Sequence, residues 1–298
     1  MKAMAIAPIL LLSVTLFSLA DDMETKVVGP GIKLVRIPGG TFQMGSNEGD
    51  LDELPVHLVT VKSFYIGETE VTNQQYCTFL NSKKPARGET FLFGETLTDW
   101  ISIRSPGWNQ LLSEGGYNQF GGYLYPTEIW YENGTYHPTI GYENNPVILV
   151  SWYGAQAFCK YYKLRLPKEE EWEYAAGGPN HYKFPWGNEW AEGMCCYNRI
   201  WSNPLDPCPT MAVKSYQANG YGLYDMSGNV FEWCRDWYDV YPGGISIEPL
   251  SVSWGNAYKV LRGGSWLSVK PGWLRCATRA HGAQYNPYNK DGFRVAGD

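Results

Sequence analysis

The sequence predicts a loop-rich, aromatic-packed fold that combines a few helices with short strands. Its 298 residues include 33 glycines, 22 tyrosines and 13 tryptophans, which is typical of long loops and aromatic packing rather than of a helical bundle. The apolar fraction of 44% is ample for a sizeable core, in one large domain or in two. Helical patterns occur near residues 72–80 and 151–176, and little helical periodicity follows Gly178. The last third is therefore expected to consist of short strands and long loops.

The first quarter of the chain predicts strands followed by a helix. Residues 33–37 (KLVRI) have a strand pattern, and a Pro-Gly-Gly turn then returns the chain as TFQMGS. The alternation in residues 58–71 (LVTVKSFYIGETEV) indicates a pair of strands around Gly67. Thr72 and Gln75 fit a capping box, so a helix is expected next, with an apolar face made of Tyr76, Phe79 and Leu80.

The middle of the chain combines a weak pattern with two further helices. Residues 83–142 are rich in Gly, Pro, Tyr and Trp and are interpreted as a long insertion, whose one clear element is a hairpin at residues 129–138 with an Asn-Gly turn. Residues 147–150 (VILV) indicate a buried strand. Ser151 can cap the helix that follows, and Pro167 is expected to open a short acidic helix.

The N-terminus has the features of a signal peptide over residues 1–20. Lys2 supplies the positive start, residues 6–19 form an apolar run, and residues 18–20 (SLA) form a small-residue cleavage site. A retained membrane anchor is the alternative, but the run is short for a span of about 20 apolar residues. We therefore expect a secreted or periplasmic protein without a membrane span after cleavage, in which residues 21–31 form a leader.

Charge and cysteine content restrict the partners and the redox chemistry. The net charge of −6 argues against a nucleic-acid partner, because binding to a polyanion depends on clustered Lys and Arg. In an exported chain, seven cysteines allow up to three disulfides with one thiol left over. Neither their connectivity nor the oligomeric state follows from the sequence.

The most informative stretch is GYGLYDMSGNVFEWCRDWYD at residues 220–239. It places Asp225, Gly228, Val230 and Glu232 in a D-x-x-G-x-V-x-E pattern. This pattern suits a hard divalent cation such as Ca²⁺, which takes carboxylate and backbone carbonyl oxygens, while a glycine lets the chain curl. Two alternatives stay open: the motif can be an ordinary turn, and Glu232 can simply be the partner of Arg235.

Several long motifs carry a family resemblance. They are IPGGTFQMGS (37–46), ETEVTNQQY (68–76), NPVILVSWYGAQAFCKYYKLRLPKEEEWEYAAGG (145–178), FPWGNE (184–189), GLYDMSGNVFEW (222–233), LRGGSW (261–266) and GFRVA (292–296). In this order they resemble the formylglycine-generating enzyme family, also called the sulfatase-modifying factor family. The resemblance implies a single α+β domain over residues 32–298, distantly like a C-type lectin fold, with the insertion at about 83–142.

The resemblance also implies structural calcium. Family members bind the ion through the stretch described above, so Asp225 and Glu232 would offer carboxylates, and Gly228 and Val230 would offer backbone carbonyls. A second family site would start at Asn198 and Ile200, with Asp206 as a later ligand. The segment that would carry this second site is shorter here than is usual in the family.

The catalytic centre of the family is missing its cysteine pair. Formylglycine-generating enzymes oxidise a client cysteine with two cysteines that bind copper, and a soft thiolate pair suits Cu(I). In this chain Ser268 occupies the first of these positions, and the second falls between Pro271 and Trp273, so copper is not expected. Cys276 aligns with a disulfide cysteine of the family whose partner position here is Ala176. It is a weak candidate for a reactive thiol, activated by a neighbouring arginine.

The ligand groove of the family is lined by the segment that carries Ser265, Trp273, Arg275 and Arg279. Aromatic and arginine side chains are typical of recognition surfaces, whereas Trp266 is interpreted as a core residue. The favoured reading is an exported, calcium-stabilised protein that binds a peptide, a glycan or a partner protein. An oxidoreductase that acts without the cysteine pair, as in siderophore maturation, is the alternative, and a genuine sulfatase-modifying oxidase is the least favoured. Whether the chain is an enzyme stays open.

Overall fold

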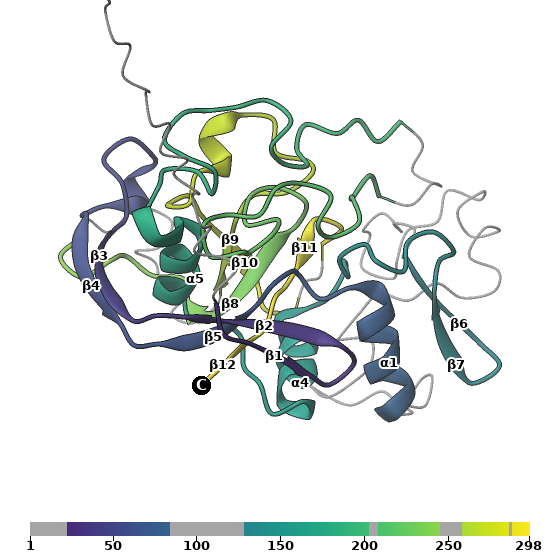
Figure 1. Cartoon of the computed structure of the whole chain (residues 1–298). Helices are drawn as coiled ribbons and strands as arrows, with labels where there is room; N and C mark the ends of the chain where they lie inside the picture. The colour runs from purple at the N-terminus through teal and green to yellow at the C-terminus, as the bar shows by residue number, and fades with distance from the viewer. Residues whose placement is uncertain (1–22, 84–127, 203–207, 245–257, 286–287) are drawn as a thin grey trace, which may run out of the picture.

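The first sheet contains both ends of the described chain. The computed structural model describes residues 23–83, 128–202, 208–244, 258–285 and 288–298 (Figure 1). Four antiparallel strands lie in the order β1 (Thr25–Val28), β2 (Ile32–Ile37), β5 (Phe64–Gly67) and β12 (Ala296–Gly297). The predicted strand at 33–37 is therefore confirmed as part of β2. The segment expected as a leader, residues 21–31, includes β1, which pairs with β2 along its whole length.

A two-stranded sheet follows the first turn. It pairs β3 (Gly40–Met44) with β4 (His57–Val61), next to α5 (Glu169–Ala176) in Figure 1. The predicted pairing of two strands around Gly67 is wrong: the break lies between β4 and β5, and these two strands enter different sheets. The reason is that both edges of β5 are already occupied, by β2 on one side and β12 on the other.

The second sheet is built by the last third of the chain, as the sequence predicted. Its strands lie in the order β10 (Arg279–Ala283), β9 (Tyr258–Arg262), β8 (Phe231–Trp237) and β11 (Asp291–Gly292), and only β11 and β8 are parallel. A separate hairpin joins β6 (Ile129–Glu132) to β7 (Thr135–Pro138). Its turn residues, Asn133 and Gly134, have φ angles of 51° and 83°, so the predicted Asn-Gly turn is confirmed.

Two helices begin at the predicted caps. At the start of α1 (Asn73–Lys83), the Thr72 amide donates to Gln75 Oε1 and the Gln75 amide donates to Thr72 Oγ1, which is the expected capping box. Ser151 accepts a hydrogen bond from the Gly154 amide at the start of α4 (Trp152–Tyr161). The predicted strand at residues 147–150 is wrong, although these residues are buried, because Leu149 has a φ of 57° that interrupts an extended backbone.

The core lies on both faces of the first sheet. Ile32 and Leu34 contact a cluster that contains the apolar faces of α1 and α4, whereas Val35 and Ile37 contact a second cluster with Trp172 of α5. Figure 1 shows α1 and α4 on one side of this sheet and α5 on the other. Within the described residues, no helix combines the length and the apolar character needed to cross a bilayer.

Candidate functional site

The stretch from Asp225 to Glu232 forms a tight turn that leads into β8. Asp225, Gly228 and Asn229 have φ angles of 56°, 79° and 59°, which lie in the left-handed region. A Cβ atom at Gly228 would lie 2.3 Å from the carbonyl oxygen of Cys196, so a side chain cannot fit there. The turn that the motif predicted therefore requires its glycine.

The two carboxylates of the motif are buried and have defined partners. Asp225 Oδ2 accepts a hydrogen bond from the Lys214 amide at 2.8 Å, and burial raises the pKa of Asp225 to about 6. Glu232 contacts Arg294, whose Nε and Nη2 atoms both lie 2.6 Å from its oxygens, and it also accepts from Trp172 Nε1 at 2.7 Å. The partner of Glu232 is thus Arg294, which is fully buried, and not the exposed Arg235 that the sequence suggested as an alternative.

Arg294 joins this turn to the first sheet. Besides Glu232, it donates to the carbonyl oxygens of Gly67 at 3.0 Å and Tyr224 at 2.9 Å. A buried guanidinium with four short hydrogen bonds fixes the positions of the groups around it, since arginine presents its donors in a rigid planar fork. The closing motif GFRVA therefore supplies the residue that orients the carboxylate of Glu232.

Glu70 is a third buried carboxylate in this region, and sequence reasoning did not single it out. Glu70 comes shortly after the end of β5 in the chain. Its side chain is 1% exposed and accepts a hydrogen bond from Asn229 Nδ2 at 3.4 Å. Burial, and next the charges of Asp225 and Glu232, raise the pKa of Glu70 well above its ordinary value. Carboxylate oxygens are the hard donors that Ca²⁺ takes. In the described part of the chain, however, only Asp50, Asp52 and Glu53 bring three such groups within 4.8 Å of one another, so Glu70, Asp225 and Glu232 do not share one ion position in this arrangement.

The expected second calcium site is less well supported. Asn198 has a φ of 48° and Ile200 is 87% exposed, while Asp206 lies outside the described residues. The amide of Asn198 donates to the carbonyl oxygen of Ser268 at 2.8 Å, and the amide of Arg199 donates to that of Trp266. This loop therefore lies against the turn at residues 265–268.

Ser268 occupies a closed turn where the family has its first catalytic cysteine. It is 4% exposed, and its Oγ accepts a hydrogen bond from the Ser265 amide at 3.0 Å. The second catalytic position falls in η4 (Pro271–Leu274), which contains no cysteine. These side chains do not fit copper, because hydroxyl groups are poor ligands for Cu(I).

All seven cysteines lie within the described residues, and all are buried free thiols. The expectation of up to three disulfides is therefore not met. Cys276 is 4% exposed, and burial raises its pKa well above the ordinary value, although Arg275 is its neighbour. Arg262 and Arg275 do act to lower this pKa, but burial outweighs them, and a protonated, buried thiol is a poor nucleophile.

The two arginines assigned to the ligand groove form internal ion pairs. Arg275 binds Glu53 with two hydrogen bonds of 2.8 and 2.6 Å, and both side chains are buried. Arg279 binds Glu169 of α5 with bonds of 2.7 and 2.9 Å. Their guanidinium groups therefore hold the fold together rather than line an open groove.

The other predicted residues of this segment divide between core and surface. Ser265 is fully buried, and Trp266 is 1% exposed, as expected for a core residue. Trp273 is 42% exposed. Among the residues assigned to the groove, Trp273 is therefore the one whose side chain can contact a ligand without a change in the fold.

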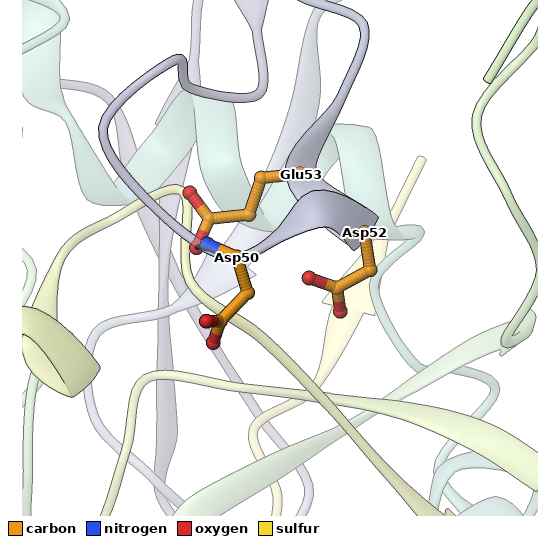
Figure 2. Close-up of side chains that lie close together, drawn as sticks. All are labelled: Asp50, Asp52 and Glu53. Atoms are coloured by element: carbon orange, nitrogen blue, oxygen red, sulfur yellow. Dashed lines mark hydrogen bonds between the residues drawn. The ribbon is translucent and has the colours of Figure 1, made fainter. Parts of the chain in front are cut away.

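An acidic turn connects this segment to the N-terminal half. Figure 2 shows Asp50, Asp52 and Glu53 projecting from the turn that contains η2 (Leu51–Glu53), and their carboxylate oxygens lie within 4.8 Å of one another. Glu53 is paired with Arg275, and Asp52 accepts a hydrogen bond from the Tyr238 hydroxyl. The ion pair of Glu53 with Arg275 therefore attaches this turn to the C-terminal segment.

A small pocket of about 110 Å³ lies beside Cys276. One wall is His181, which stacks on Phe42 and whose pKa is lowered by burial. Glu173 contributes its buried carboxylate, which is paired with Arg262 and accepts a hydrogen bond from the Gly45 amide at 2.8 Å. Because its charged groups are paired within the fold, this pocket offers few free polar contacts to a ligand.

Comparison with known proteins places the chain in a family. Residues 19–298 match the model of the sulfatase-modifying factor enzyme 1-like domain, so the chain belongs to this family, as its motifs indicated. It is 33% identical to the formylglycine-generating enzyme of Streptomyces coelicolor, over 89% of this chain and 88% of that protein. The single domain with little regular secondary structure is thereby confirmed.

Two further relatives show where the same fold occurs. The chain is 35% identical to a protein of Chlamydia pneumoniae named serine/threonine-protein kinase pkn1, over 93% of this chain but 40% of that protein. The chain thus spans about 40% of the length of the Chlamydia relatives that it matches. The structure of Treponema denticola variable protein 1 has a TM-score of 0.60 at 24% identity, covers 93% of this chain and 99% of that one, and shares the fold.

Proposed function

We propose that this chain is an exported, calcium-stabilised binding protein of the family, without copper-dependent cysteine oxidation. The observation that carries the proposal is the turn at Ser268, where a buried hydroxyl replaces a thiol, while residues 271–273 hold no cysteine. None of the seven cysteines occupies either position, and each of them is buried. The predicted signal peptide at residues 1–20 supports export, which makes a secreted or periplasmic location the natural setting for calcium.

The calcium part of the proposal rests on the turn at residues 225–232. Asp225 and Glu232 offer carboxylates and Gly228 and Val230 offer backbone carbonyls, in a buried turn that Arg294 holds in place. A bound ion would stabilise the junction between the two larger sheets, because this turn leads directly into β8. Its role is structural, and no reaction step is assigned to it.

The binding part rests on an exposed apolar patch, which we call the 267–273 surface. Leu267, Val269 and Trp273 are 47%, 51% and 42% exposed, and Ile200 on the neighbouring loop is 87% exposed. The loop bonds of Asn198 and Arg199 hold Ile200 next to this segment. Aliphatic side chains beside a tryptophan favour an apolar peptide or protein over a glycan, whose hydroxyl groups need hydrogen-bond partners.

A direct assay tests the absence of oxidase activity. The purified protein is loaded with Cu(I) and incubated with oxygen and a cysteine-containing sulfatase peptide, with the Streptomyces coelicolor relative as positive control. We expect no loss of the peptide thiol and no aldehyde by mass spectrometry. Aldehyde formation by this chain would contradict the proposal.

A matched pair of variants tests the binding surface. Ile200→Ser changes an 87% exposed residue beside the 267–273 surface, and Ile140→Ser changes an 89% exposed residue after the β6–β7 hairpin. On an array of apolar peptides, we expect Ile200→Ser and Trp273→Ala to lose the signal of the wild-type protein, and Ile140→Ser to keep it. Equal signals from all four proteins, or none above background, would refute the proposed surface.

A further inference from the structure

The segments that build the 267–273 surface carry positive charge as well as apolar side chains. Residues 196–202 and 264–279 contain four basic residues and no Asp or Glu. Two of the four are the buried arginines of the ion pairs described above. The other two, Arg199 and Lys270, are exposed, and neither forms an ion pair with a residue that the structure describes. The surface therefore combines apolar side chains with two uncompensated positive charges.

The backbone holds Lys270 beside Trp273. The Trp273 amide donates to the carbonyl oxygen of Lys270 at 3.0 Å, and the ammonium nitrogen of Lys270 lies 5.5 Å from the centre of the Trp273 ring. The carbonyl oxygen of Gly272 accepts hydrogen bonds from Arg275 Nε at 3.0 Å and from the Thr278 hydroxyl at 2.9 Å. Buried side chains thus fix this turn, so a ligand meets an aromatic ring and a positive charge at one place with little loss of entropy.

The neighbouring loop brings the second charge to the same surface. The amide of Arg199 donates to the carbonyl oxygen of Trp266 at 2.9 Å. Trp201 packs edge-on against the Trp266 ring, with the ring centres 6.0 Å apart. Ile200 lies between these two contacts and keeps its side chain in solvent. The loop therefore adds one positive charge and one apolar side chain beside residues 266–268.

An acidic peptide fits these charges better than an anionic lipid surface does. Recognition of anionic lipids usually takes a cluster of about four to eight Lys or Arg residues, and this surface has two. The net charge of −6 would also oppose the approach of the whole protein to a negatively charged membrane. A single carboxylate beside the two charges interacts mainly with them, because salt screens exposed charges beyond about 10 Å.

We propose that the 267–273 surface binds an acidic, apolar peptide segment of a partner protein. An apolar side chain of the segment packs against Trp273, and a neighbouring Asp or Glu side chain pairs with Lys270 and Arg199. This inference rests on the proposed function, because it presumes that the surface binds a peptide. It adds a charge preference to a site that was defined only by its exposed apolar side chains.

Fluorescence polarisation with labelled peptides tests this preference. One apolar core, Leu-Phe-Leu, is flanked by Glu, by Gln or by Lys, and both ends of each peptide are blocked. We expect the Glu peptide to bind the protein about five-fold more tightly than the Gln peptide at about 50 mM salt, and the Lys peptide to bind most weakly. At about 0.5 M salt the advantage of the Glu peptide should fall below about two-fold, because ions screen exposed pairs.

Charge-reversal variants identify the residues responsible. Lys270→Glu and Arg199→Glu should each reverse the order, so that the Lys peptide binds more tightly than the Glu peptide. Lys62→Glu is the matched control: it changes the net charge equally, at an exposed lysine between β4 and β5, and should keep the wild-type preference. A reversal that also occurs in Lys62→Glu would overturn the assignment to Lys270 and Arg199.

The outcomes separate this inference from the proposed function. Equal binding of the Glu and Gln peptides, with loss of both in Ile200→Ser, would refute the charge preference and leave the apolar surface standing. If none of the three peptides binds, both inferences are overturned. Binding to phosphatidylserine vesicles that Lys270→Glu abolishes, without binding to the Glu peptide, would replace the peptide by a membrane and overturn the proposal.

Discussion

Replacing Arg275 by Met should destabilise the protein strongly, because Arg275 is the counter-ion of a buried carboxylate. Glu53 is fully buried, and its two oxygens lie 2.8 and 2.6 Å from the guanidinium nitrogens of Arg275. Removing one partner of such a pair costs about 3–5 kcal/mol, since the remaining charge stays buried without compensation. That is a large part of the roughly 5–15 kcal/mol that stabilises a typical domain.

Urea unfolding at 25 °C, followed by tryptophan fluorescence in calcium-containing buffer, measures this loss. The double variant Glu53→Met with Arg275→Met should recover stability to within about 2 kcal/mol of the wild type, because apolar residues of similar volume often replace a buried pair without loss. Lys183→Met breaks the exposed pair with Glu48 and should change the stability far less than Arg275→Met does, because solvent screens an exposed pair. A single variant Arg275→Met within about 1 kcal/mol of the wild type would refute this assignment of Arg275 to the fold.

Three further predictions follow from burial and backbone geometry. Iodoacetamide at pH 7.5 should label none of the seven cysteines of the folded protein and all of them after unfolding, because each thiol is buried; rapid labelling of Cys276 would contradict this. Gly228→Ala should lower the free energy of unfolding in urea by more than about 2 kcal/mol, because a Cβ at this position meets the backbone of Cys196. The control variant Gly272→Ala should change it by less than about 1 kcal/mol, because a Cβ there meets nothing within 4 Å. Burial raises the pKa of Glu128 from 4.5 to about 8, so the contribution of Glu128 to stability is full below about pH 4.5 and is lost as the pH rises to about 8. Glu128→Gln should therefore make the fall in the free energy of unfolding between about pH 5 and 8.5 shallower. An unchanged slope in this variant would argue against the assignment.

The parts of the fold that sequence reasoning could predict depend on local interactions. The capping box at Thr72, the cap at Ser151 and the Asn133-Gly134 turn involve residues within four positions of each other, so their patterns are visible in the sequence. Strand pairing was harder, because the partners of β5 lie at the two ends of the chain. The run at 147–150 is apolar enough for a strand, and only the φ of Leu149 shows that it is none.

The candidate site was predicted where the motif is contiguous and missed where it is not. Asp225 and Glu232 share one turn, so their spacing alone indicates a common site. Glu70 lies near this turn from the segment after β5, 155 positions before Asp225, and no periodicity marks it. Likewise, Arg275 and Glu53 are 222 positions apart, so the sequence could show two charges but not that they neutralise each other.

Metal analysis of protein purified without chelator tests the central claim most directly. The account predicts about one calcium ion per chain by mass spectrometry, no stoichiometric copper, and a melting temperature that falls when the calcium is removed. Stoichiometric copper would contradict the account, since it requires ligands that Ser268 and residues 271–273 do not supply. A protein that holds no calcium and melts at the same temperature with and without chelator would contradict it as well.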